Sequence, residues 1–286
     1  MNWLTSPYEW WIRPFTEHAF MRDAVIAAGL VVICSAMVGT WVVLRGLSFL
    51  GDALAHGVLP GIAVAWMLGA NTALGALIAA LAMVGGVNLV KSSSPLPDDA
   101  SIGILFVGFL SLAVVIMSAS GGSGDLNRFL FGSITSVNQR DIVSLAIVTA
   151  ITIIAVSVLH RALLLGTFDV EQATLAGFRP RVVHLALLIL IAVVVVASFE
   201  TVGSLLVFAF LIAPPATASL FSRRVSTIMM FAIIIGMTSS YIGIVISYHY
   251  RSAASATMSL TNITMFFLVM AGRTFVTKRH SRSVGH

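Results

Sequence analysis

The chain has 286 residues, of which 58% are hydrophobic and only 9% are charged, and its mean hydropathy is +1.02. A soluble globular domain carries roughly 25% charged residues, so this composition excludes one and is typical of an integral membrane protein. The formal charge of +5 does not indicate nucleic-acid binding, because the basic residues stand singly at the ends of apolar segments. The single cysteine, Cys34, excludes a disulfide framework, and we expect it to be inert packing.

Residues 1–19 mix tryptophan, tyrosine and phenylalanine with charged residues and two prolines. They contain neither the apolar core nor the small-residue cleavage site of a signal peptide. Aromatic and amphipathic composition next to a first span is typical of a segment that lies in the membrane interface. We therefore expect an interfacial N-terminal segment over 1–19.

The rest of the chain predicts an all-α, polytopic transmembrane bundle, because a spanning helix needs about 20 predominantly apolar residues. Dividing the sequence at charges, Gly/Pro clusters and polar runs gives nine such segments, with eight or ten as alternatives. They cover residues 20–44, 48–70, 72–90, 102–119, 141–160, 183–199, 201–220, 226–247 and 257–273. Almost nothing separates the second segment from the third, or the sixth from the seventh, so we expect two tight helical hairpins. No soluble block large enough for a second domain remains, so we expect 1–286 to form one transmembrane domain.

The basic residues predict the orientation of the chain in the membrane. Eleven of the 16 lysines and arginines fall on one side if the chain crosses nine times from an external N-terminus. These are Arg45, Lys91, Arg161, Arg179, Arg181, Arg223, Arg224, Arg273, Lys278, Arg279 and Arg282. Positive loops stay inside, so we expect a cytoplasmic tail over 274–286, whereas an even span count would break this assignment.

Two ionisable residues, Asp52 and His56, lie in the otherwise apolar or small stretch 46–61. Such residues are costly inside a membrane span and by default mark a functional site. Four residues apart on a helix, they project from one face and can hold one divalent cation. Counted from Ser48 at the predicted inner boundary, His56 lies about 12 Å deep. In the alternative interpretation, Asp52 is a helix-start residue among headgroups and His56 hydrogen-bonds a neighbouring helix.

Pro60 continues the same row of the second span. It has no amide hydrogen to give to the carbonyl of His56, so we expect a kink and a free backbone oxygen beside the imidazole. Carboxylate, imidazole and carbonyl are a partial shell for Mn2+, Zn2+ or Fe2+. The adjoining row has a small residue at every fourth position, which lets another helix approach closely. Its members are Ala53, Gly57, Gly61, Ala65 and Gly69.

Two further features are candidates for a pathway or gate. Glu200 falls at the predicted outer turn between two spans, where it either benefits from a helix-start dipole or attracts cations to the mouth of a pathway. Pro214 and Pro215 remove two backbone donors deep in the following span and free the carbonyls of Phe210 and Leu211. This arrangement indicates either a hinge or a packing feature.

The predicted cytoplasmic stretch 165–178 has the signals of a short capped helix. Asp169 is placed as its N-cap, Glu171 in its first turn and Gly177 at its stop. Such a helix can transmit force to a partner, although most capped turns only connect spans.

Several enzyme signatures are absent from the sequence. It contains no Gly-x-x-x-x-Gly-Lys-Ser/Thr phosphate loop, so any ATP-driven step must come from another polypeptide. It also contains no Ser/His/Asp set, no Cys-x-x-Cys and no His-Glu-x-x-His. We therefore expect neither enzymatic activity nor a permanently bound cofactor.

Several stretches resemble the permease subunits of bacterial ABC importers for manganese, zinc or iron, which work with a cluster A-I metal-binding protein. Residues 45–61 are similar to the family's Arg-x-x-Ser-x-x-Gly-Asp-Ala-x-x-His-x-x-Leu-Pro-Gly. Further similar stretches are Asp99–Ile104, Phe129–Ile134, Phe168–Ala173, Val202–Val207 and Leu211–Ala218. The chain departs from the family at Arg251, where an acidic or amide residue is usual, and at Pro215, where alanine is usual.

The resemblance implies a type II ABC importer-like fold in the bacterial cytoplasmic membrane. It implies that two permease copies pair among membrane lipid, that an ATPase subunit docks on each inner face and that an external protein delivers the metal. It makes Asp52 and His56 the ligands of the transported ion, Mn2+ or Zn2+ before Fe2+. It makes the helix from Phe168 to Gly177, with Ala173, the coupling element.

Two other classes of transporter stay open as alternatives. An ion-coupled secondary metal transporter would use the acid and imidazole as a proton relay, but its usual inverted repeat is not found in the sequence. An ABC importer of a metal chelate would need a wide channel without ligands for a bare ion.

Overall fold

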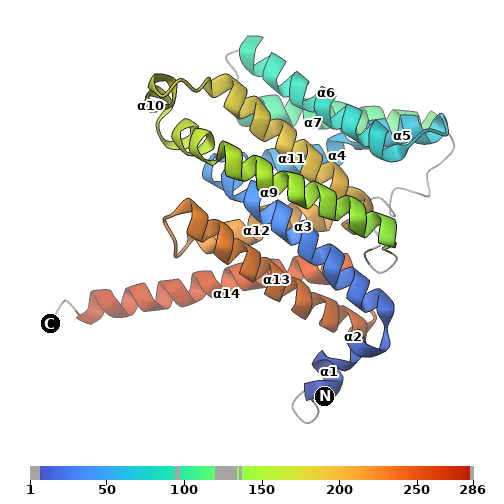
Figure 1. Ribbon diagram of the computed structural model, residues 1–286, viewed down its shortest axis with the longest axis vertical. Coiled ribbons are helices and arrows are strands. Elements are labelled where there is room, and N and C mark those ends of the chain that lie inside the picture. Colours follow the sequence, from blue (N-terminus) through green and yellow to red (C-terminus); the bar gives the residue numbers. More distant parts are fainter. Residues whose placement is uncertain (1–6, 94–96, 120–133, 135–136, 284–286) are drawn as a thin grey trace.

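The computed structural model describes residues 7–93, 97–119, 134 and 137–283, and the regular elements of this part are helices (Figure 1). The stretch Phe129–Ile134, which the resemblance includes, lies outside the described residues except for Ile134. The helices are α1 (Pro7–Trp11), α2 (Arg13–Glu17), α3 (Ala19–Leu44), α4 (Ser48–Gly57), α5 (Leu59–Met67), α6 (Thr72–Ser93), α7 (Asp98–Ala119), α9 (Gln139–Phe168), α10 (Val170–Leu175), α11 (Pro180–Val202), α12 (Ser204–Ser219), α13 (Val225–Tyr250) and α14 (Ala254–Ser283).

Eight helical stretches in the described part are long and apolar enough to cross a membrane, with α4 and α5 counted together as Ser48–Met67. The seventh predicted segment, 201–220, is present as α12, which has only 16 residues. At 1.5 Å per residue it is about 24 Å long, less than the roughly 30 Å of a hydrocarbon core. This helix is enclosed by its neighbours, since Leu206, Phe210 and Leu211 are 0% exposed.

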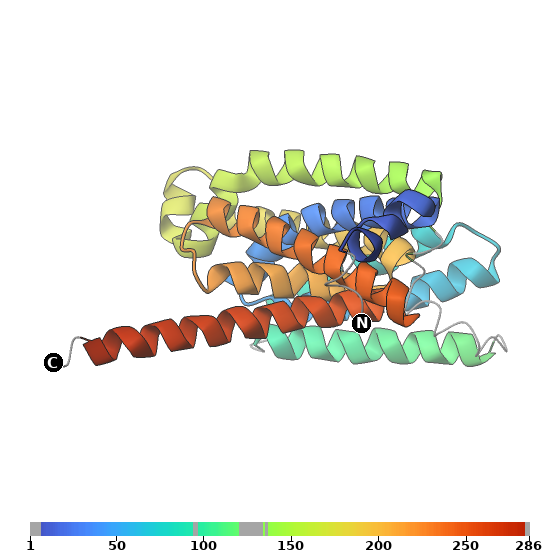
Figure 2. The same ribbon diagram turned by 90° about the horizontal axis from the view of Figure 1, so that it is seen from below.

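The core lies where α3 meets α9, α12 and α13. Seen from below, α9 lies on one side of the bundle, α7 and α14 lie on the other, and α3, α12 and α13 run between them (Figure 2). At Gly39 of α3 an added Cβ would overlap the backbone carbonyl of Leu211 in α12. The two backbones therefore touch, and only glycine fits at this crossing.

The predicted tight hairpins are confirmed. Helices α5 and α6 are joined by a short turn at Gly69, whose φ is +62°. Along this pair, a Cβ at Gly61 would overlap the carbonyl of Gly75, and one at Gly75 would overlap that of Gly61. The small-residue row therefore brings two backbones together, as its four-residue spacing predicts. The second hairpin, α11–α12, turns at Gly203 with φ +80°.

This second turn corrects one boundary. The sequence places the break between spans at Glu200, but α11 continues to Val202 and the positive φ is at Gly203. Glu200 thus belongs to the last turn of α11 and not to a helix start, so the dipole argument for a carboxylate there does not apply. The side chain of Glu200 is outside the described part.

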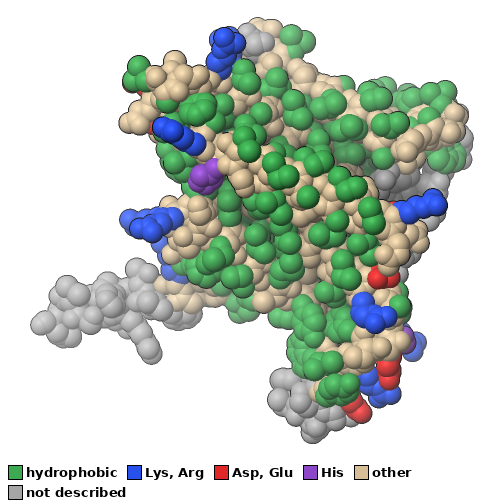
Figure 3. Space-filling model, viewed as in Figure 1, with side chains coloured by type: hydrophobic (Ala, Val, Ile, Leu, Met, Phe, Trp, Pro, Cys, Tyr) green, Lys and Arg blue, Asp and Glu red, His purple; other side chains and the backbone are tan. Residues whose placement is uncertain are grey.

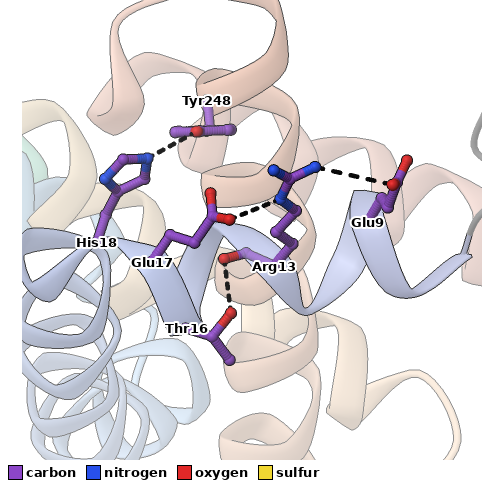
Figure 4. Close-up of polar contacts among 6 residues, drawn as sticks. All are labelled: Glu9, Arg13, Thr16, Glu17, His18 and Tyr248. Carbon is purple, nitrogen blue, oxygen red and sulfur yellow. Dashed lines mark hydrogen bonds and ion pairs between the residues drawn. The ribbon is translucent and has the colours of Figure 1, made fainter.

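The N-terminal helices α1 and α2 pack against one end of α13 (Figure 4). His18 and Tyr248 are hydrogen-bonded at 2.9 Å, and the ring of Trp10 stacks on His249 at 3.9 Å between centroids. Tyr241 donates a hydrogen bond of 2.6 Å to the carbonyl of Trp11. These contacts fix the segment to the bundle at the end opposite α10 (Figure 1).

Candidate functional site

Asp52 and His56 lie one turn apart on α4, and their side chains point toward each other. Nε2 of His56 is 3.6 Å from Oδ1 of Asp52, which is too long for a hydrogen bond. Two ligand atoms held at metal distances of roughly 2.1 Å, with an angle of 90–110°, lie about 3.0–3.5 Å apart. The separation therefore suits two adjacent ligands of one ion after a small adjustment.

Two observations argue against the alternative interpretation of the pair. Helix α4 begins at Ser48, so Asp52 lies beyond its first turn and is not a helix-start residue. Within the described part of the chain, His56 makes no hydrogen bond to a neighbouring helix; its polar contact is Asp52. Neither side chain has a local structural task that accounts for its presence in a span.

Both side chains lie on the open stripe of α4. The side chain of His56 is 22% exposed and that of Asp52 is 30% exposed, while the opposite face is buried. There, Leu50 and Leu54 are fully enclosed, and a Cβ at Gly51 would meet the Leu211 side chain at 2.5 Å. The buried face fixes the rotation of α4 and thereby directs the acid and the imidazole outward from this copy of the chain.

An aromatic side chain from another helix lies beside the pair. The ring of Phe106, from α7, lies 5.9 Å from the imidazole of His56 between centroids. Phe49 packs edge-on against Phe106, also at 5.9 Å between centroids. Phe106 could not be recognised from the sequence, because its neighbours along the chain are equally apolar and nothing distinguishes it.

The helix is interrupted beside the site. α4 ends at Gly57, and α5 begins at Leu59 with the buried Pro60 in its first turn. Val58, between them, keeps helical dihedral angles (φ −76°, ψ −21°), so the backbone is only slightly disturbed before the proline. The amide of Val58 is directed at the carbonyls of Leu54 and His56, so the expected free oxygen beside the imidazole is not present.

In the described part of the chain, Asp52 and His56 do not belong to a larger cluster of ligand side chains. Among the described residues, no group of three or more His, Cys, Asp or Glu side chains is arranged to hold a metal. Metal ions bind at least four ligands in proteins. We expect further ligands of a bound ion to come from water, backbone oxygens, another chain or residues outside the described part.

Pro214 and Pro215 lie within α12 and are buried. Without its own amide hydrogen, Pro215 leaves the Leu211 carbonyl without an intrahelical donor, and this carbonyl faces Gly39. Thr217 donates to the Ala213 carbonyl at 2.7 Å and supports the helix after the prolines. Both prolines are therefore packed inside the bundle, and a hinge at this point stays a prediction.

The short helix α10 has the predicted caps. Asp169 accepts a hydrogen bond of 2.9 Å from the amide of Gln172, and Gly177 ends the helix at φ +83°. The amides of Gly177 and Phe178 donate to the carbonyls of Thr174 and Ala173 respectively, both at 3.0 Å, which is a Schellman motif.

One side of α10 packs and the other is open. Ala173 is 1% exposed and seats the helix on the bundle. Phe168, Val170 and Leu175 are 64%, 54% and 88% exposed, so apolar side chains project from this end of the molecule. Glu171 is exposed among them. An exposed apolar cluster of this kind marks a contact surface.

Known proteins match this chain over most of its length. The sequence profile described as the ABC 3 transport family matches residues 17–273. The "Manganese transport system membrane protein MntC" of Listeria innocua is 34% identical over 252 residues, covering 88% of this chain and 90% of that protein. A "Probable iron transport system membrane protein" of Haemophilus influenzae is 32% identical over 264 residues, covering 92% and 97%.

A solved structure has the same arrangement of helices. The structure "PsaBC from Streptococcus pneumoniae in complex with Fab" superposes with a TM-score of 0.81 and 31% identity, over 91% of this chain and 94% of that one. The similarity extends through the bundle that holds the site.

Proposed function

We propose, since this chain belongs to the ABC 3 transport family, that it is the transmembrane permease subunit of an ATP-driven importer of divalent transition metal ions. The observation that carries the proposal is the Asp52–His56 pair: a carboxylate and an imidazole, both able to bind a metal ion, lie 3.6 Å apart in a span. Relatives named for manganese favour Mn2+ as the cargo, and another is named for iron. Oxygen and imidazole ligands suit Mn2+, Zn2+ and Fe2+.

The whole described chain then acts as one permease domain in the cytoplasmic membrane of a bacterium. Basic side chains gather at the end that holds α10 (Figure 3). Arg45, Lys91 and Arg181 line one groove there, and Arg223 and Arg224 line another. We take this end as the inner side. Positive residues are retained on the cytoplasmic side. The tail 274–286 is therefore cytoplasmic, and α1 and α2 lie outside.

A second copy of the chain completes the pathway. Asp52 and His56 lie on the exposed stripe of α4, and a carboxylate facing acyl chains at this depth would cost several kcal/mol. If two copies pair across this stripe, the Asp52–His56 pair of each copy would face a water-containing route between them instead of lipid. The two Asp52–His56 pairs together would also supply four protein ligands, whereas one pair supplies two.

The chain itself carries no catalytic group in this scheme, and ATP is hydrolysed on a separate subunit. We assign its docking surface to α10 and the end of α9, where the exposed Phe168, Val170 and Leu175 would bury apolar area against the ATPase. An external metal-binding protein would deliver the ion at the opposite end. Closure of the two copies alternately toward each side then moves the ion past Asp52 and His56.

Metal uptake by the assembled transporter in vesicles tests this function. Asp52→Asn and His56→Gln should each reduce ATP-dependent Mn2+ uptake at low metal concentration at least tenfold, since both changes replace a strong ligand by a weak one of equal size. Ser48→Ala, on the same stripe one turn earlier, is the control and should transport normally. Uptake at the wild-type rate in both ligand variants would refute the site.

A further inference from the structure

A groove of about 760 Å³ lies near the inner end of the molecule, between α6, the end of α9 and the start of α11. Three basic side chains, Arg45, Lys91 and Arg181, line it together with Asn88 and His184. None of the described residues that line it is acidic. We call this feature the basic groove.

The contacts of Arg45 indicate one positive charge in the basic groove that is not neutralised. Its guanidinium donates through Nε to Thr167 Oγ1 at 2.8 Å and through Nη2 to the Leu163 carbonyl at 3.4 Å, both uncharged acceptors. In the described part of the chain it has no ion pair with a carboxylate. Partial burial lowers the pKa of Arg45 below its ordinary value. Removing a cation from water without a counter-ion is costly, so an anion here would stabilise the protein.

The rim of the groove is apolar and open. Val182 and Leu185, both of α11, line it and are 58% and 37% exposed. A free inorganic anion would gain nothing from this rim, whereas a molecule with both a phosphate and hydrocarbon chains would use the cations and the rim together.

We propose that the basic groove binds an anionic phospholipid of the cytoplasmic leaflet, with the headgroup phosphate among Arg45, Lys91 and Arg181 and the acyl chains against Val182 and Leu185. The proposal rests on the orientation given above, which places this end of the bundle at the inner headgroups. Bound lipid would neutralise Arg45 and fix the start of α11 to the end of α9, close to α10.

Lipid retention by the assembled, detergent-purified transporter tests the proposal. Phosphatidylglycerol and phosphatidylcholine are titrated separately, and the bound lipid is counted by native mass spectrometry. Each basic residue near an anionic lipid contributes about fivefold in affinity, so Lys91→Gln/Arg181→Gln should weaken phosphatidylglycerol binding roughly 25-fold. The single change Arg181→Gln, at an exposed side chain that leaves the packing intact, should weaken it about fivefold.

A matched control removes the same charge at the same end. Arg161→Gln/Arg224→Gln alters two exposed residues that do not line the groove, and it should bind phosphatidylglycerol as the wild type does. Equal weakening in both double variants would overturn the proposal. So would equal retention of phosphatidylcholine, or full displacement of the lipid by inorganic phosphate at the same concentration.

Two further measurements distinguish a lipid site from a subunit contact and from the metal pathway. If adding the ATPase subunit to permease alone releases the phosphatidylglycerol, the groove is a subunit contact and the lipid proposal fails. Asp52→Asn should lose metal uptake while it retains the lipid. The lipid site and the proposed transport function can therefore each fail without the other.

Discussion

Asp52 and His56 lie on one face of α4 because they are four residues apart, and they are partly exposed while Leu50 and Leu54 on the opposite face are buried. Their Oδ1–Nε2 distance of 3.6 Å leaves both side chains without a strong mutual bond. A span that needed only stability would have apolar residues at both positions. The cost of the pair is therefore expected to be offset by function.

Arg251 carries backbone strain at the residue scale. It follows α13 with φ 51° and ψ 38°, in the left-handed region that costs an ordinary residue about 1–2 kcal/mol. Arg251→Gly should therefore raise the free energy of unfolding by about 0.5–1 kcal/mol after the entropy cost of glycine. Thermal unfolding in detergent measures it. Arg251→Ala keeps the strain and should give no gain; equal stabilisation by both would contradict the account.

The residue-level site was partly predictable from sequence. Two ionisable residues four apart in an apolar stretch identify Asp52 and His56, because the cost of burying charge makes them conspicuous. The Arg251 departure likewise falls where asparagine or aspartate tolerates the left-handed conformation better. Phe106 could not be predicted, because which apolar side chain of another helix stands beside an imidazole depends on tertiary packing.

At the scale of elements, the sequence predicted some helix ends correctly and misplaced others. The caps of α10 depend on Asp169 and Gly177 alone, and both act as the sequence indicates. The break near Pro60 falls at Val58, where the backbone is only slightly disturbed. The end of α11 was misplaced, since the charge at Glu200 suggested a boundary that Gly203 actually sets.

The cap of α10 gives the element-scale prediction. Asp169→Ala removes the acceptor of the Gln172 amide and should destabilise this six-residue helix by about 0.5–2 kcal/mol, whereas Asp169→Asn keeps a capping oxygen. If α10 couples the permease to its ATPase, Asp169→Ala should lower the metal moved per ATP hydrolysed, with little effect from Asp169→Asn. Transport stoichiometry in vesicles measures this. Unchanged coupling in the alanine variant would exclude a role for the cap.

At the scale of the whole molecule, the two ends differ in character. One end carries α10, its exposed apolar side chains and the grooves lined by basic residues; the other carries the aromatic N-terminal segment fastened to α13. Composition and charge alone predicted a polytopic bundle whose basic residues gather mainly at one end. They could not reveal that α12 is short and enclosed, because its hydropathy equals that of a span.

Cysteine labelling tests the orientation directly. In a Cys34→Ala background, Leu175→Cys in α10 and Tyr8→Cys in α1 place thiols at positions that are 88% and 59% exposed. In intact cells, a membrane-impermeant maleimide should label Tyr8→Cys only, and Leu175→Cys should react only after lysis. The opposite pattern would reverse the proposed sidedness and the direction of transport.

Pulsed electron paramagnetic resonance of Mn2+ bound to the permease–ATPase complex, without the external metal-binding protein, tests the central claim most directly. An imidazole ligand couples its nitrogen to the unpaired electrons of the ion. The account predicts this nitrogen coupling in the wild type and in a control, His160→Gln, and its loss in His56→Gln. Undiminished coupling in His56→Gln, or bound Mn2+ without nitrogen coupling in the wild type, would contradict an ion held between Asp52 and His56.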